Sequence, residues 1–106
     1  MFHLLLIKLI FAHCLADYPL QGDFLASAKN HKKPISGVPW YQALGAHAAI
    51  QAGFVWLITG SLTCATVELI AHAVIDYLKC DGRTTYNQDQ AMHIFCKVFY
   101  AMALTR

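Results

Sequence analysis

The stretch PISGVPWYQALGAHAAIQAGFVWLITGSLTCATV, which runs from Pro34 to Val67, contains no Asp, Glu, Lys or Arg in 34 residues. Roughly 20 mostly apolar residues suffice for one membrane span, so this stretch can hold one complete span and the start of another. Over the whole chain, 58% of the 106 residues are hydrophobic and only 13% are charged, whereas an average soluble domain is roughly 25% charged. We therefore expect residues 1–106 to form a single integral membrane domain.

Four apolar segments predict four helices. They are longer than ordinary strands, they lack internal proline, and their polar residues recur at a spacing of four, which is typical of helices. The segments are Met1–Ala16, Trp40–Ile58, Leu62–Leu78 and Gln90–Leu104. A short amphipathic piece, Gln21–Lys29, lies between the first two. The predicted fold is an all-α, four-helix transmembrane bundle with a short interfacial helix between helices 1 and 2. Because each segment is slightly short for a span, a soluble helical bundle is the alternative.

The basic residues predict the orientation of this bundle. If the helices alternate in direction, the connections Asp17–Pro39 and Lys79–Gln88 lie on one side and carry five of the eight Lys and Arg residues. Lys and Arg favour the cytoplasmic side, so we expect an inner-membrane protein with both termini outside. A formal net charge of +2 is too weak to indicate a nucleic-acid partner.

Histidine and aspartate recur four residues apart at the ends of three predicted helices. In the first and third segments the His precedes the Asp, and in the fourth, which runs the opposite way, the Asp comes first. Residues four apart share a helix face, so each Asp lies near the cytoplasmic end and each His one turn deeper. A histidine of the second segment reaches the same depth. The seven residues are His13, Asp17, His47, His72, Asp76, Asp89 and His93.

Imidazole nitrogens and carboxylate oxygens are the ligands of zinc-like divalent metals. A catalytic zinc usually takes three protein ligands and keeps a water, so seven candidates can furnish two ions, or one ion with supporting hydrogen bonds. We expect a divalent transition metal, zinc first, with iron, manganese, cobalt and nickel as alternatives. A purely structural polar network and a proton or ion relay are the other interpretations.

Glu68 and Lys97 continue two of these helix faces toward the middle of the bundle. Glu68 lies four residues before His72, and Lys97 lies four residues after His93. An isolated charge at the midplane of a membrane is costly. We therefore expect an ion pair between Glu68 and Lys97 beneath the site, with a structural role.

The same residues carry a family resemblance. The run HCLADYPLQ at residues 13–21, followed by Lys29, resembles the opening H-x-x-x-D-F-x-L-Q…K motif of a bacterial and phage membrane-protein family, domain of unknown function 3307. His47, HAVIDYLK at residues 72–79 and DQAMH at residues 89–93 match its later blocks in order, although Tyr18 stands where Phe is more usual. The resemblance implies a small helical membrane protein with a His and Asp site and no established substrate. The chain is also distantly similar to membrane-bound metal-dependent hydrolases.

These observations predict a metal-dependent hydrolase that acts on a membrane lipid, or on a lipid-linked phosphoester or ester, at the cytoplasmic interface. The four histidines, Asp17 and Asp76 are the expected ligands, and Asp89 is a further ligand or the catalytic base. Lys79 is expected to stabilise developing negative charge, and Gln21 and Lys29 to position a head group. The alternatives are a non-enzymatic membrane protein that binds a metal or carries ions, as a homo-oligomer or alone, and a bacterial or phage protein that binds a host membrane partner.

Overall fold

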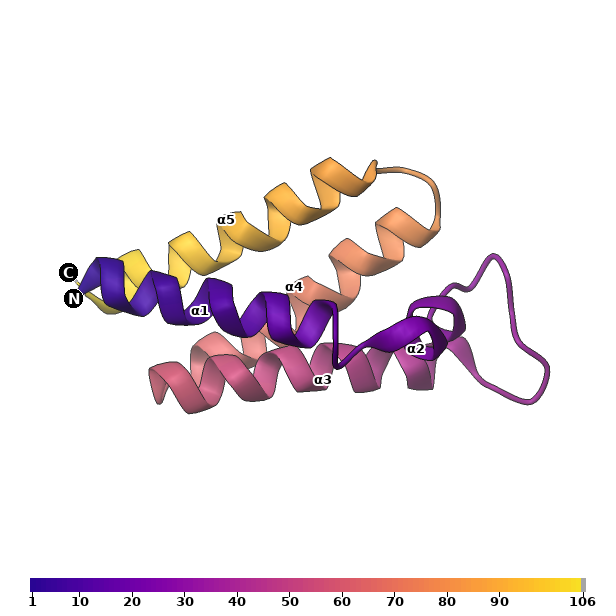
Figure 1. Cartoon of the computed structure of the whole chain (residues 1–106), viewed down its shortest axis with the longest axis horizontal. Helices are drawn as coiled ribbons and strands as arrows, with labels where there is room; N and C mark the ends of the chain where they lie inside the picture. The colour runs from indigo at the N-terminus through magenta and orange to yellow at the C-terminus, as the bar shows by residue number, and fades with distance from the viewer. Residues whose placement is uncertain (106) are drawn as a thin grey trace.

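Five α-helices make up the chain. The computed structural model describes residues 1–105, and these contain no β-strand. Four long helices form an antiparallel bundle, and the short helix α2 (Gly22–Ala28) lies between the first two of them (Figure 1). The long helices are α1 (Phe2–Asp17), α3 (Trp40–Thr59), α4 (Leu62–Cys80) and α5 (Tyr86–Leu104). The all-α prediction, with four long helices and one short one, is confirmed.

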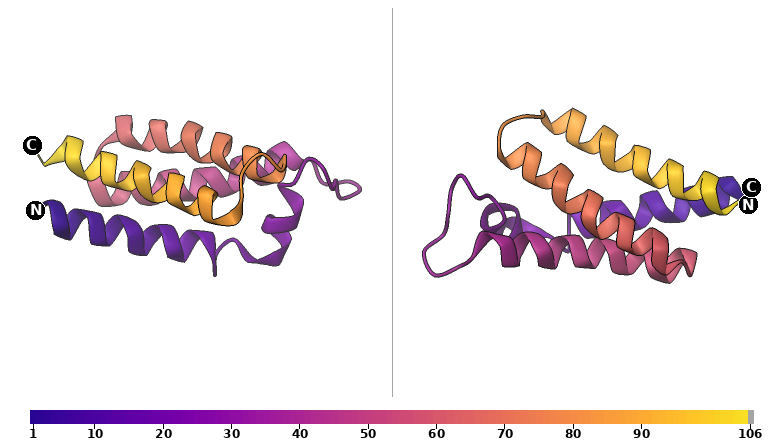
Figure 2. Two further views of the ribbon diagram at one scale, coloured as in Figure 1. Left: turned by 90° about the horizontal axis from the view of Figure 1, so that it is seen from above. Right: turned by 180° about the vertical axis from the view of Figure 1, so that it is seen from behind.

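Each long helix packs against two others, so that the four enclose one interior. α1 contacts α3 and α5, and α4 contacts the same two helices. Both termini and the α3–α4 turn lie at one end of the bundle, called here the terminal end (Figure 2). The helix α2 and the α4–α5 connection lie at the other end, called here the α2 end. The predicted alternation of helix directions is confirmed.

Two helix boundaries have clear local causes. Gly60 ends α3 with a φ of 70°, a left-handed conformation that glycine adopts without strain. α5 begins four residues before its predicted start at Gln90, because Thr85 and Gln88 form a capping box. The Thr85 hydroxyl accepts from the Gln88 backbone N–H, and the Gln88 side chain accepts from the Thr85 N–H.

The long helices have 16 to 20 residues each, or about 24–30 Å at 1.5 Å per residue. Within residues 1–105, none of the helices is by itself both long and apolar enough to cross a membrane. α1 and α2 meet the criteria of length and composition only together, and the chain bends by 82° between them.

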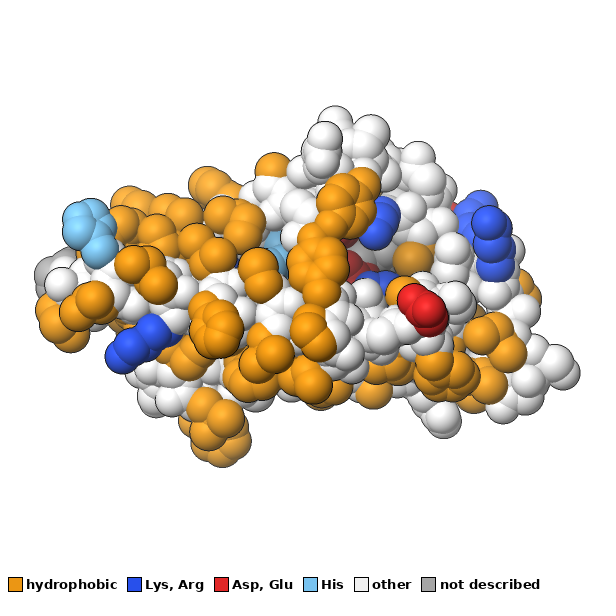
Figure 3. All heavy atoms as spheres, viewed as in Figure 1, with side chains coloured by type: hydrophobic (Ala, Val, Ile, Leu, Met, Phe, Trp, Pro, Cys, Tyr) orange, Lys and Arg blue, Asp and Glu red, His pale blue; other side chains and the backbone are white. Residues whose placement is uncertain are grey.

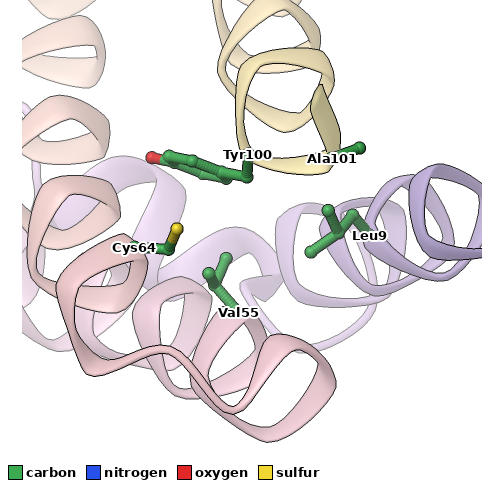
Figure 4. Close-up of a cluster of buried hydrophobic side chains, with 5 residues drawn as sticks. All are labelled: Leu9, Val55, Cys64, Tyr100 and Ala101. Atoms are coloured by element: carbon green, nitrogen blue, oxygen red, sulfur yellow. The ribbon is translucent and has the colours of Figure 1, made fainter. Parts of the chain in front are cut away.

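The interior is apolar at the terminal end and polar toward the α2 end. The apolar cluster consists of Leu9, Val55, Cys64, Tyr100 and Ala101, contributed by all four long helices (Figure 4). Beyond it, ten of the other twenty buried side chains are ionisable. Large hydrophobic side chains cover much of the outer face, as Figure 3 shows in orange. The interior toward the α2 end is therefore where the candidate site lies.

Candidate metal centre

The seven predicted ligand residues lie together in the interior of the bundle. They come from α1, α3, α4 and α5, and none of them is more than 8% exposed. Two groups of three can each hold a metal ion, because their ligand atoms lie within 4.8 Å of one another. One group is Asp17, His47 and His72, and the other is His72, Asp76 and His93. The spacing of four therefore did bring side chains from separate helices to one place.

The two groups meet at His72. In the first group, Nε2 of His47 is 3.0 Å and Nε2 of His72 is 3.9 Å from Oδ1 of Asp17. In the second, Nε2 of His93 is 3.1 Å from Oδ1 of Asp76, and Nε2 of His72 is 3.4 Å from Oδ2. Asp17 of α1 thus offers an oxygen to imidazoles of α3 and α4, and Asp76 of α4 offers oxygens to imidazoles of α4 and α5, an arrangement that suits a shared cation.

The two ring nitrogens of His72 have different surroundings. Nδ1 lies 3.1 Å from Oε2 of Glu68, whereas the buried Nε2 has no hydrogen-bond partner among residues 1–105. Because an ionised carboxylate only accepts, Nδ1 carries a proton, and Nε2, which faces Asp17 and Asp76, is the nitrogen left without a partner. Metal-binding histidines are commonly held by a carboxylate in this way. The orientation of His72 is therefore that of a metal ligand.

Glu68 is itself held by two partners from α5. Nζ of Lys97 donates to Oε2 of Glu68 at 2.8 Å, and the Tyr100 hydroxyl donates to Oε1 at 3.0 Å. All three side chains are no more than 1% exposed. The predicted ion pair between Glu68 and Lys97 is confirmed, and it anchors the carboxylate that orients His72.

Gln90, which sequence reasoning did not single out, connects three of the predicted residues. Its Oε1 lies 3.1 Å from Nε2 of His13, and its Nε2 donates to Oδ2 of Asp17 at 2.9 Å and to Oδ2 of Asp89 at 3.2 Å. The remaining oxygen of Asp89, Oδ1, is buried without a hydrogen-bond partner in the described chain and lies 3.4 Å from Nε2 of His93. His13 and Asp89 therefore border the two ligand groups.

Gln51 is a second residue that the sequence analysis passed over. Its side chain is 1% exposed, and its Nε2 lies 3.4 Å from the backbone oxygen of His13 and 3.5 Å from Oδ1 of Asp17. Gln51 follows His47 by four residues, so the same-face rule that selected the His and Asp pairs could have found it.

The predicted lysines occupy different positions. Lys29, at the end of α2, is 7% exposed, and its Nζ donates to Oδ2 of Asp76 at 2.8 Å and also to Oε1 of Gln21. Nζ of Lys79 instead lies 4.9 Å from the centre of the Tyr86 ring and forms no salt bridge with a described residue. Of the two predicted catalytic residues, Asp89 lies in the cluster and Lys79 lies outside it.

The cluster is reached from the side of the bundle. Figure 3 shows acidic and basic side-chain atoms in a recess that has hydrophobic side chains along one side. Tyr18 follows Asp17 in the sequence, and Tyr86 is the first residue of α5. Their hydroxyls form a hydrogen bond that joins the end of α1 to the start of α5. This bond raises the pKa of Tyr18 to about 12. Both tyrosines are about half exposed.

A separate polar cluster connects the segment between α2 and α3 with the end of α4. Nε2 of His31 lies 2.9 Å from Oδ1 of Asp81, and Arg83 donates to Oδ2 of Asp81 at 2.7 Å. The His31 ring stacks on Tyr77 with a centroid distance of 4.0 Å. The hydrogen bond from Arg83 is the main cause that holds the pKa of Asp81 below its ordinary value.

The fold and the site together define a small all-α bundle that encloses a His and Asp cluster able to hold a metal ion. Residues 5–106 match the family described as "Protein of unknown function (DUF3307)". The match covers nearly the whole chain, so the chain belongs to this family, as the sequence motifs predicted. No curated protein and no solved structure matches the chain.

Proposed function

We propose that this chain is a membrane-embedded protein that binds one divalent transition-metal ion, zinc first, and uses it to hydrolyse a lipid or a lipid-linked phosphoester or ester. One observation carries the proposal. Nε2 of His72 is buried without a partner among the described residues and faces carboxylate oxygens of Asp17 and Asp76, while Glu68 keeps the proton on Nδ1. An unpartnered imidazole nitrogen in that position suits a metal ion.

The charge of the cluster supports one ion. Three buried carboxylates, those of Asp17, Asp76 and Asp89, are accompanied by the single ammonium group of Lys29, because Lys97 is paired with Glu68. With neutral imidazoles, two negative charges are left in a buried site, which is costly. One divalent cation cancels them. Protonation of two histidines would cancel the same charge, and metal titration distinguishes the two.

The distribution of side chains supports embedding in a membrane. Among the described residues, eight of the fourteen buried apolar side chains are alanines, whereas eleven polar or charged side chains are buried. The large apolar side chains point outward instead, as Phe11, Leu57, Ile70 and Phe95 do, each at least 62% exposed. A polar interior inside an apolar surface suits a lipid environment, where the surface needs no water contact.

The proposed orientation follows from the basic side chains. Lys32, Lys33, Lys79 and Arg83 belong to the α2 end, and Lys and Arg favour the cytoplasmic side of a membrane. Both termini then lie outside, and the recess opens near the cytoplasmic surface. Reporter domains fused to either terminus should both report the outer compartment. If the two fusions report opposite compartments, the two termini do not lie on the same side of the membrane, and the proposed insertion of the bundle is wrong.

The chemistry proposed for the site is hydrolysis. A bound divalent ion would make a water molecule a stronger nucleophile and would polarise the bond to be broken. Asp89, whose buried Oδ1 has no hydrogen-bond partner among the described residues, would take a proton from the attacking water. The water oxygen bonds to the phosphorus or carbonyl carbon, the bond to the leaving oxygen breaks, and that oxygen receives the proton. The apolar cluster around Leu9 and Val55 closes the interior at the terminal end, which favours this role over ion transport.

Metal titration of the purified protein tests the proposal. After removal of metal with a chelator, the protein in detergent should bind about one zinc ion, measured by calorimetry and by elemental analysis. His72→Ala and Asp76→Ala should abolish binding, whereas His31→Ala, a histidine outside the cluster, should not. Turnover of phosphoesters and esters should require the metal. A folded protein that binds no transition metal would overturn the proposal, and stoichiometric metal without turnover would leave only the binding function.

A further inference from the structure

We infer that Lys29 fits the proposed metal centre to a divalent ion, because it supplies one fixed positive charge that disfavours a trivalent ion. The inference rests on the proposed function and deepens it, since it names the residue that decides which kind of ion the centre takes. It begins from the ammonium group of Lys29, which lies among the proposed ligands although the residue belongs to the end of α2.

The ammonium group shares a carboxylate oxygen with proposed ligands. Nζ of Lys29 donates to Oδ2 of Asp76 at 2.8 Å. The same oxygen lies 3.4 Å from Nε2 of His72 and 3.7 Å from Nε2 of His47. Asp76 and both histidines belong to the three-residue groups that can hold an ion. Two positive charges a few ångströms apart in a buried site repel each other, so the ammonium group weakens the binding of any ion in the cluster.

Contacts on both sides of Lys29 along the chain hold it in this position. Its Nζ also donates to Oε1 of Gln21, and Nε2 of Gln21 donates to the backbone oxygen of Asp17 at 3.0 Å. Two residues after Lys29, Nε2 of His31 lies 2.9 Å from Oδ1 of Asp81. Lys29 itself is only 7% exposed. Its charge therefore stays in the cluster when an ion binds.

The other basic side chains near the cluster have different partners. Nζ of Lys97 is paired with Glu68 at 2.8 Å, and Nζ of Lys79 lies 4.9 Å from the centre of the Tyr86 ring. Among the described lysine and arginine side chains, only Lys29 forms a salt bridge with one of the seven predicted ligand residues. Lys29 is therefore the cation that sets the charge of the site.

The charges of the site match one divalent ion. The carboxylates of Asp17, Asp76 and Asp89 carry three negative charges, and Lys29 supplies one positive charge. With neutral imidazoles, two negative charges remain, and a divalent ion cancels them. A trivalent ion would leave one positive charge uncompensated in a buried site, which is costly. Without Lys29, three negative charges would remain, and the match would change to a trivalent ion.

Iron provides the test, because the same element binds as Fe²⁺ and as Fe³⁺. The affinity for each ion is measured in detergent by competition with a chelator, without oxygen in the case of Fe²⁺. Lys29→Met should raise both affinities, because a repelling charge is removed. Coulomb energy is proportional to the charge of the ion, so a gain of about tenfold for Fe²⁺ should accompany a gain of about thirtyfold for Fe³⁺.

Lys33→Met is the matched control, because Lys33 is an exposed lysine of the segment that follows α2. It should change neither affinity. Equal gains for the two ions in Lys29→Met, or a fall in both affinities, would assign Lys29 a structural role and overturn the inference.

A second background keeps the test valid if Lys29→Met does not fold. The substitution is then made in Asp89→Asn, where it restores the net charge of the wild-type site, and the affinities are compared with those of Asp89→Asn alone. The gain should again be larger for Fe³⁺ than for Fe²⁺, and equal gains would again overturn the inference. A folded wild type that binds neither zinc nor iron would refute the metal centre itself, which is a separate result.

Discussion

The carboxylate of Glu68 contacts Nδ1 of His72 at 3.1 Å from one turn away on α4, and both side chains are almost fully buried. Lys97 and Tyr100 hold this carboxylate from α5. The unpartnered nitrogen of His72 is thus oriented by a network that lies below the proposed metal ligands. This arrangement separates groups that would touch an ion from groups that only orient the ligands, and the two kinds respond differently to substitution.

Removing the carboxylate without leaving a buried charge should weaken metal binding while preserving the fold. We expect the double variant Glu68→Gln and Lys97→Met to bind zinc about 10–100-fold more weakly, the usual effect of losing a ligand's hydrogen-bond partner. Competition with a chelator measures the affinity, and circular dichroism checks the helices. An unchanged zinc affinity would show that Glu68 does not orient His72.

Lys97→Met alone should be far more damaging to stability than the double variant. The substitution leaves the Glu68 carboxylate buried without its cation, and breaking such a pair costs about 3–5 kcal/mol. The free energy of unfolding, measured by denaturation in detergent, should fall by this order, and adding Glu68→Gln should restore most of it. Equal stability of the single and double variants would contradict a coupled pair.

Asp89→Asn should separate binding from catalysis. We expect zinc affinity to change less than tenfold, because Asp89 lies outside both three-residue groups. Turnover should fall by about 10²–10⁴-fold, the usual contribution of a general base. Asp17→Asn provides the comparison, since it should lower both. If Asp89→Asn loses zinc as Asp17→Asn does, then Asp89 is a ligand and another group takes the proton.

Lowering the pH should remove the contribution of the Asp81 carboxylate to stability. Its pKa is held below the ordinary value of 3.8 mainly by the hydrogen bond from Arg83, so the contribution is complete above that value and is lost as pH falls below it. The melting temperature of the wild type should therefore exceed that of Asp81→Asn at pH 6, and the difference should shrink toward pH 3. If the difference in melting temperature does not change with pH, the ionisation of Asp81 is not its cause.

Much of the fold could be predicted from hydrophobic segments and their polar interruptions. The predicted boundaries of α3 and α4 fall within two residues of the observed ones, because apolar runs bounded by Pro39, Gly60 and the Asp81–Gly82 turn leave few alternatives. The start of α5 was missed because its first turn, YNQD, is polar and is fixed by the Thr85 cap rather than by burial.

The sequence predicted which residues form the site, but it did not predict which of them contact one another. Spacing of four identifies side chains on one helix face, but it does not show which neighbour each of them meets. Lys29 illustrates this limit, because it reaches Asp76 through the bend between α1 and α2, a feature that no periodicity encodes. Gln90 was overlooked because it lies beside Asp89 in sequence, one position away from the face that was followed.

His72 belongs to both three-residue groups, yet it has only one nitrogen left to give. A lone pair serves one ion at a time, so occupancy of either trio dismantles the other. In the proposed centre the two three-residue groups are therefore alternative positions for one ion and not sites for two ions at once.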